Sequence, residues 1–344
     1  MSDPASPRFS VLDLAPIRQS GTAADSFRET LDLARHVETL GYHRFWLAEH
    51  HNIPGVASAA TSVLIGYVAG GTSRIRVGAG GIMLPNHPPL VIAEQFGTLE
   101  LLYPGRIDLG LGRAPGSDVP TARALRRDLQ FGGDDFPDQV QELQSYFQPG
   151  GPGTGVHAVP GEGVDVPIYL LGSSDFGARR AASLGLPYAF ASHFAPDYLF
   201  AAIDLYRRNF QPSPVLDRPY VMVGMNVVAA DTDAEAAVLF TSIQQMFLNL
   251  IRGTSGKLPP PVETMEGRWS AAEQATVDRM TRVSAVGSQE TVRQKLASLL
   301  DATRADEFIV TSQIFDHAAR LRSFEIGAKA FADLCHESSA AARA

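Results

Sequence analysis

Cysteine is almost absent from this chain: Cys335 is the only one among 344 residues. A single cysteine cannot form an internal disulfide, and no partner ligands stand near it. This excludes a disulfide-stapled fold, and we interpret Cys335 as a structural or surface thiol rather than a nucleophile.

Long apolar runs and an excess of positive charge are also lacking. No run reaches the roughly 18 apolar residues of a membrane span, and Met1–Arg8 is polar, without the apolar region of a signal peptide. The net charge is −8, with 29 basic and 37 acidic residues, which argues against nucleic acid or an anionic membrane as partner. We therefore expect a cytoplasmic protein that binds neither.

Apolar residues, in contrast, make up 45% of the chain, enough for a sizeable core. Eight short apolar runs alternate with segments of helical spacing, which favours a closed (β/α)8 TIM barrel, an α/β fold, over an open sheet. We predict one barrel domain over residues 1–344, with disordered ends at 1–8 and 338–344. The predicted strands lie near residues 10, 46, 78, 109, 170, 189, 224 and 309.

Two stretches are too long for ordinary connections in such a barrel. Residues 149–165, rich in Gly and Pro, form an insertion after the fourth strand. Residues 252–284 form another before the eighth strand and contain three consecutive prolines. The second could be a mobile lid over the barrel mouth, or equally a surface insertion.

The most informative stretch is Phe45–Asn52, an apolar run that ends in Glu49, His50 and His51. Side chains at the C-terminal ends of parallel strands form the active sites of barrels. Adjacent residues on a strand face opposite ways, so only one of the two histidines should point into such a site. The pattern alone does not say which.

Two rival sites are weakly supported. His50, His51, His87 and His193 could gather around a metal, but His-x-His spacing is absent, and we expect no metal site. The glycines between 110 and 116 resemble a dinucleotide-binding loop, but the third glycine is one residue late and Pro115 stands where a helix should begin.

An anion site is the third possibility. Ser173 and Ser174 stand where a strand ends and a helix opens, and free N–H groups at a helix N-terminus bind phosphate. Arg113, at the end of another strand, could supply the charge; ordinary capping by either serine is the alternative. Gly80 and Gly81 interrupt a strand, which suggests close approach of a flat ligand or tight packing in the barrel.

Four motifs, in order and at barrel-strand spacing, together resemble the bacterial luciferase-like monooxygenase family, most closely its single-chain flavin-dependent oxidoreductases. The resemblance spans Phe9 to about Phe331. The motifs are Trp46-Leu-Ala-Glu-His-His51, Arg76-Val-Gly-Ala-Gly-Gly-Ile-Met-Leu-Pro-Asn-His-Pro-Pro89, Pro104-Gly-Arg-Ile-Asp-Leu-Gly-Leu-Gly-Arg-Ala-Pro-Gly116 and Leu170-Leu-Gly-Ser-Ser174.

The resemblance implies a barrel with reduced flavin, usually FMN, at its C-terminal mouth. His50 then matches the active-site histidine, and Gly80-Gly81 matches a pair that often carries a cis peptide bond. Arg113, Ser173 and Ser174 match the phosphate-binding positions. The chain departs from the family pattern at Asp175, an acid beside the phosphate site, and at Ser192, where the luciferases carry an aromatic residue.

The implied activity is oxygenation of a small organic substrate with reduced FMN and O2, with His50 as general acid/base. No NAD(P)H motif is evident, so we expect a separate reductase to deliver reduced flavin. The resemblance also implies a homodimer or higher homo-oligomer. Hydride transfer with the deazaflavin F420 is one alternative function, and flavin binding without turnover is another.

Overall fold

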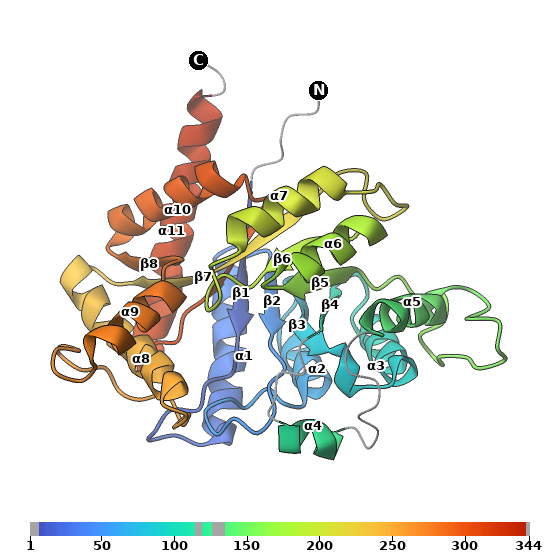
Figure 1. Ribbon diagram of the computed structural model, residues 1–344, viewed down its shortest axis with the longest axis horizontal. Coiled ribbons are helices and arrows are strands. Elements are labelled where there is room, and N and C mark those ends of the chain that lie inside the picture. Colours follow the sequence, from blue (N-terminus) through green and yellow to red (C-terminus); the bar gives the residue numbers. More distant parts are fainter. Residues whose placement is uncertain (1–6, 114–118, 126–134, 342–344) are drawn as a thin grey trace.

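A parallel eight-stranded barrel forms the centre of the computed structural model, which describes residues 7–113, 119–125 and 135–341 (Figure 1). The strands join in the order β1-β2-β3-β4-β5-β6-β7-β9 and close from β9 back to β1, while β8 pairs only with β7 outside the ring. The bounds are β1 Arg8–Asp13, β2 Arg44–Leu47, β3 Arg76–Met83, β4 Ile107–Gly112, β5 Ile168–Gly172, β6 Tyr188–Phe190, β7 Val221–Ala229, β8 Ser284–Gly287 and β9 Glu307–Thr311.

Helices follow the strands and surround the barrel, so the predicted fold class and the eight predicted ring strands are confirmed. The sequence did not indicate the short helix α4 or the outer strand β8. The helices are α1 Ala23–Thr39, α2 Thr61–Gly71, η1 Leu84–Asn86, α3 Pro89–Leu102, α4 Val119–Leu125, α5 Phe136–Phe147, α6 Asp175–Leu184, α7 Leu199–Asn209, α8 Asp233–Ile251, α9 Ala271–Met280, α10 Gln289–Thr303 and α11 His317–Ala341.

Alternation along each strand divides the apolar side chains between two cores. Side chains that face outward, such as Val11 and Phe45, pack against the helices in the main core. Side chains that face inward, such as Leu12 and Trp46, meet in a smaller core inside the barrel. This two-residue period explains why the strands read as continuous apolar runs: both faces of a parallel barrel sheet are buried.

A buried ionic network fills the barrel interior near the N-terminal ends of the strands. The Arg44 guanidinium, 1% exposed, lies 2.8 Å from a Glu307 carboxylate oxygen and 2.7 Å from Asp108. The Tyr220 hydroxyl donates to Glu307 at 2.7 Å, and the Trp46 indole N–H donates to Asp108 at 3.0 Å. Each buried charge therefore has a partner, which offsets the cost of its removal from water.

The two predicted disordered ends, 1–8 and 338–344, border regular elements. Arg8 belongs to β1, where its backbone pairs beside Glu307. At the other end α11 continues through residues 338–341.

The long segment before β9 contains regular structure. Besides α9 it holds β8, which pairs with the outer half of the nine-residue strand β7, from Asn226 opposite Ser284 to Ala229 opposite Gly287. The Leu258 amide donates to the Ile17 carbonyl at 2.8 Å, which fastens the segment to the loop after β1. Residues 149–165, in contrast, form a loop beyond α5, as predicted.

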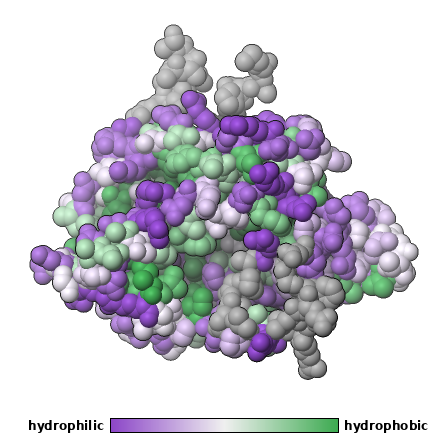
Figure 2. All heavy atoms as spheres, viewed as in Figure 1, coloured by the Kyte–Doolittle hydropathy of each residue, from purple (hydrophilic) through white to green (hydrophobic). Residues whose placement is uncertain are grey.

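Within the described ranges of the chain, α8 is the one helix that is long and apolar enough to cross a membrane by length and composition. It is a core helix: Ile243, Phe247 and Leu248 are buried in a cluster that also contains Val228 of β7 and Val277 of α9. The face of the molecule in Figure 2 mixes polar and apolar side chains and is hollowed near its centre.

Candidate functional site

A cavity of about 430 Å³ lies at the C-terminal ends of the barrel strands. All of the residues predicted for the site contribute to its lining, although they come from four different strand ends. They are His50, Gly80, Gly81, Arg113, Ser173 and Ser174.

The loop after β2 divides its histidines between two environments. The His50 side chain lines the cavity, and His51 does not. His51 instead lies on the far side, where its Nε2 is 2.7 Å from a Glu49 carboxylate oxygen. The expectation that one of the two imidazoles faces the site is met, and it is the one that the resemblance selects.

Glu49 anchors this loop to β3 and to the turn before α3. Its carboxylate, 1% exposed, accepts from His51, from His87 Nε2 at 2.9 Å and from the Met83 amide at 3.1 Å. Burial opposes the charge, but these hydrogen bonds outweigh it and lower the pKa of Glu49. The sequence did not reveal the partnership with His87, because 38 residues separate the two.

Glu49, His51 and His87 together have a ligand set that could hold a metal ion, with donor atoms within 4.8 Å of one another. The distances are those of hydrogen bonds. Since a carboxylate only accepts, each Nε2 carries the proton in this arrangement. Glu49, His51 and His87 therefore form a hydrogen-bonded cluster next to the loop that carries His50.

Glycines in β3 are required by strand packing. A Cβ atom on Gly78 would lie 2.4 Å from the Asp108 carbonyl oxygen, and one on Gly81 would lie 2.7 Å from that of Gly110. A Cβ on Gly80 would meet Leu12 and Trp46, each at 2.9 Å. Tight packing, rather than a ligand, therefore explains these residues, although Gly80 and Gly81 still line the cavity. The peptide bond between them is cis, as the resemblance implies.

The corner between β5 and α6 brings several hydrogen-bond donors together. Ser174 is the N-cap of α6, but its side chain makes no capping hydrogen bond, and ordinary capping therefore does not explain it. Arg113, across the corner, places its guanidinium carbon 4.1 Å from the Phe176 ring centroid. Hydroxyls, helix N–H groups and a guanidinium thus surround one end of the cavity, as an anionic group requires. Residues 114–116 of the Arg113 motif lie outside the described part of the chain.

Asp175 does not obstruct this corner. Its side chain is 70% exposed, lies 3.8 Å from Arg179 on the same helix face, and is not part of the cavity wall. The sequence departure at this position therefore leaves the anion corner intact.

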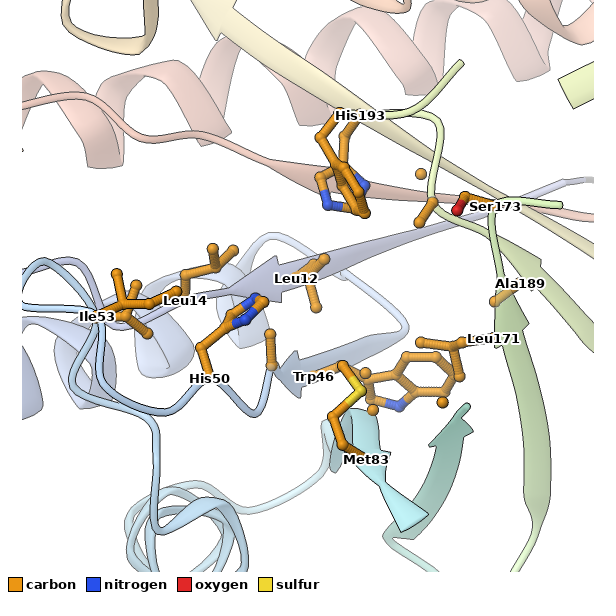
Figure 3. Close-up of a pocket in the computed structure, with 18 of the residues that line it drawn as sticks. Leu12, Leu14, Trp46, His50, Ile53, Met83, Leu171, Ser173, Ala189 and His193 are labelled. Carbon is orange, nitrogen blue, oxygen red and sulfur yellow. The ribbon is translucent and has the colours of Figure 1, made fainter. Parts of the chain in front are cut away.

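The wall opposite His50 carries a second imidazole, that of His193, in the loop after β6. Figure 3 shows the two rings approaching the cavity from opposite sides. Burial, with a contribution from His50, lowers the pKa of His193 to about 4, so this ring is neutral at pH 7. Ser192 is fully buried and donates to the Gly224 carbonyl at 2.5 Å; Phe194 beside it lines the cavity.

Gln313, two residues after the end of β9, lies in the cavity wall and was not predicted. Ser312 follows β9 directly, but its hydroxyl points outward to Ser323, and Gln313 lines the cavity. The alternation of inward side chains from Ile309 onward could have identified it. Met246 and Phe247 of α8 also line the cavity, whereas Met225 of β7 belongs to the main core.

These features fit a flavin mononucleotide. The anion corner suits its phosphate, and the apolar floor of Leu12, Trp46 and Ala189 suits a flat ring system. His50 lies beyond that floor, where a proton could be exchanged (Figure 3).

Solved structures share the fold. The apo form of MsnO8 is 37% identical, covers 95% of this chain and 98% of its own, and has a TM-score of 0.89. More distant folds include the FMN-bound oxygenating constituent of 3,6-diketocamphane monooxygenase from Pseudomonas putida, with 18% identity, coverage of 95% and 98%, and a TM-score of 0.69. An F420-dependent secondary alcohol dehydrogenase shares 14% identity, coverage of 95% and 99%, and a TM-score of 0.66.

Sequence comparison is more specific. The uncharacterized protein YvbT of Bacillus subtilis (strain 168) is 60% identical over 319 residues, 92% of this chain and 95% of that protein. The luciferase-like monooxygenase of Escherichia coli (strain K12) is 57% identical over 318 residues, again 92% and 95%. The model of the luciferase-like monooxygenase family matches residues 8–307. The chain therefore belongs to the luciferase-like monooxygenase family, an oxidoreductase family.

Proposed function

We propose that the protein is a monooxygenase that uses reduced FMN and O2 to oxygenate a small organic molecule. The observation that carries the proposal is the pairing of an anion corner with His50 across one apolar floor in the same cavity. When bound, reduced flavin supplies the electrons that activate O2, and the protein binds, orients and excludes water.

Each part of the cavity wall has a task in this proposal. Arg113, Ser173 and Ser174 hold the phosphate, while Trp46 and Leu12 support the ring from below. His50 Nδ1 or Nε2 takes up and returns a proton, which an imidazole does efficiently near neutral pH. The hydrogen bonds that Glu49 accepts from the Met83 amide and from His87 hold the loop that carries His50 in place.

The choice of cofactor is tested by titrating the apo protein with FMN and with F420 under identical conditions. We expect FMN to bind at least tenfold more tightly, since the anion corner offers one cluster of donors for one phosphate. Tighter binding of F420 would instead support hydride transfer. Tight FMN binding without O2-dependent substrate oxidation would support a flavin-binding protein without turnover.

We also propose that reduced flavin comes from a separate reductase in the cytoplasm. Among the described residues that line the cavity, no cationic cluster is left for a second, phosphorylated dinucleotide beside the Arg113 corner. The purified chain with FMN should therefore oxidise NADH or NADPH only at background rates, and addition of an unrelated flavin reductase should start turnover. Rapid oxidation by the chain alone would overturn this part.

A second copy of the chain is the proposed partner in solution. Apolar side chains on the neighbouring helices α2 and α3 are exposed, among them Val63 at 72%, Tyr67 at 45% and Leu102 at 63%. Exposed apolar faces of this kind mark association surfaces. Light scattering should give at least twice the monomer mass, and Val63→Glu together with Leu102→Glu should lower it.

The segment 252–284 is proposed to move during ligand exchange. Its residues Gly256 and Leu258 line the cavity mouth and lie against the loops after β1 and β2. A Cβ atom on Gly55 would lie 2.2 Å from the Gly256 carbonyl oxygen. Gly55→Ala should therefore displace the segment and speed FMN release in stopped-flow measurements; an unchanged release rate would argue that the segment is a fixed wall.

A further inference from the structure

The cavity wall formed by β6, β7 and β9 has no role in holding the cofactor in the proposed function. Its members differ from those of the anion corner. Ile309 and Ala191 supply apolar surface, and His193 and Gln313 supply neutral polar groups. This wall faces the place where the organic substrate must lie if the flavin occupies the other side.

Gln313 is unusual among the buried polar residues. It is 5% exposed and lines the cavity, yet its side-chain amide makes no hydrogen bond within the described part of the chain. Its amide atoms are not among the fully buried polar atoms that lack a partner in the described residues, so they are accessible from the cavity. An amide in this position bonds to a ligand or to water in the cavity.

His193 presents one nitrogen to the same cavity. Its Nδ1 is fully buried and has no hydrogen-bond partner among the described residues, and a Cβ atom on Gly224 would lie 2.7 Å from it, so Nδ1 faces β7 and is closed to a ligand. The ring nitrogen left to face the cavity is Nε2. Since burial keeps the ring neutral, it offers one N–H donor and one acceptor nitrogen.

The two residues belong to one continuous sector of the mouth. The Asn226 amide of β7 donates to the His193 carbonyl at 2.7 Å, and Asn226 stands opposite Thr311 in the register of β7 and β9. Thr311 lies two residues before Gln313, on the same inward side of the chain. Its buried hydroxyl likewise has no partner in the described structure.

The charged side chains of the cavity wall make their contacts outside this sector. Among the described residues that line the cavity, Arg113 and Lys257 are the charged side chains. The Arg113 guanidinium stacks on Phe176 at the anion corner, and the Lys257 ammonium donates to the Gly21 carbonyl at 2.8 Å. A charged substrate group placed against Gln313 would lose its hydration without gaining a counter-charge.

We propose that Gln313 and His193 form a hydrogen-bonding subsite for an uncharged, carbonyl-like acceptor on an otherwise apolar substrate. The amide N–H of Gln313 and the ring N–H of His193 donate to that acceptor, and the apolar wall holds the rest of the molecule. This inference rests on the proposed function, because it assigns the remaining side of the same cavity.

The test uses three probes with one chain length and different end groups: 2-heptanone, heptanoate and heptylammonium. Each is titrated into FMN-loaded protein, and binding is followed by calorimetry and by the visible spectrum of the flavin. We expect 2-heptanone to bind at least tenfold more tightly than either ion. Equal affinities, preference for an ion, or no binding of any probe to the FMN-loaded protein would overturn the inference.

Two substitutions locate the effect. Gln313→Leu should weaken the binding of 2-heptanone about five- to tenfold, which is the loss expected for one hydrogen bond. The affinity for FMN should stay within twofold of the wild-type value. Gln313→Glu should instead raise the affinity for heptylammonium. The same chemical change on the surface of α9, Gln274→Leu, is the matched control and should alter neither affinity.

FMN titrations of the same samples distinguish a failure of the proposed function from a failure of the proposed subsite. If the wild-type protein binds no FMN, the proposed function fails. If FMN binds normally but Gln313→Leu leaves 2-heptanone binding unchanged, or if the ketone competes with FMN, only the subsite is wrong.

Discussion

The two ends of the barrel interior both contain polar side chains, but these differ in whether they are hydrogen-bonded. At the N-terminal end Arg44, Asp108 and Glu307 are bonded to one another and to tyrosine hydroxyls. At the C-terminal end the hydroxyl of Ser174 does not cap its helix, and Gln313 lacks a partner within the described residues. Paired polar groups indicate structure, and unpaired groups beside a cavity indicate a ligand.

The largest expected effect is at the C-terminal end, on activity alone. His50→Asn should lower the rate of substrate oxidation roughly 10²- to 10⁴-fold, the usual contribution of a general acid or base. FMN affinity should change less than threefold, since other residues hold the phosphate. Unchanged turnover under saturating reduced FMN would remove His50 from the mechanism.

At the N-terminal end of the barrel interior, a substitution should change the free energy of unfolding. Arg44→Met leaves the buried Glu307 carboxylate without its counter-charge, whereas Asp108 keeps Arg76 at 2.6 Å. The change should cost about 3–5 kcal/mol of unfolding free energy. Denaturant titration measures this loss. Arg28→Met, in an exposed pair with Asp25, is the control and should have little effect. A mild effect of Arg44→Met would show that the two ends do not differ as described.

The anion corner should lose affinity without losing stability. Arg113→Gln removes a charge-assisted contact to the phosphate and should weaken FMN binding roughly 10- to 100-fold. Riboflavin, which lacks the phosphate, should bind the variant and the wild type equally. Arg179→Gln on the exposed face of α6 controls for a general change of charge. An equal loss for riboflavin would place Arg113 elsewhere in the mechanism.

The effect that is smallest at pH 7 belongs to His193, and it grows as the pH falls. Its pKa is about 4 in the folded protein and ordinarily 6.5, so the unfolded chain binds the extra proton between these values. Stability should be unaffected above pH 6.5 and fall below it, by up to about 1.4 kcal/mol per pH unit, until pH 4. His193→Gln should make this decline shallower in urea titrations at pH 7, 6 and 5. Parallel declines would show that the ring protonates freely in the fold.

Much of the barrel could be read from the chain because the strands are buried on both faces and stand out as apolar runs. The strand β8 was not predicted, because Ser284–Gly287 is short and pairs with an extension of β7. Pairing at a sheet extension depends on the tertiary position of the partner, which local sequence does not contain. The same reason hid the partnership of Glu49 with His87.

The candidate site could be read in part. His50, Arg113 and Ser173 stand directly after strands, and barrel geometry brings such positions together. Gln313 was missed because the side chain that turns inward after β9 depends on where the strand alternation stops. Of the two explanations offered for Gly80 and Gly81, tight packing is supported: the Gly110 backbone excludes a Cβ atom at Gly81, and the Leu12 and Trp46 side chains exclude one at Gly80.

The uncapped N-terminus of α6 links folding to the supply of ligand. A helix that begins without a side-chain cap lacks up to about 1–2 kcal/mol of local stabilisation. An anion bound at Ser174 and Arg113 would provide the missing acceptor, and a ligand at a hundred times its Kd adds about 2.7 kcal/mol to the folded state. The resistance of this corner to heat and to proteases would then follow the concentration of free phosphorylated cofactor around it.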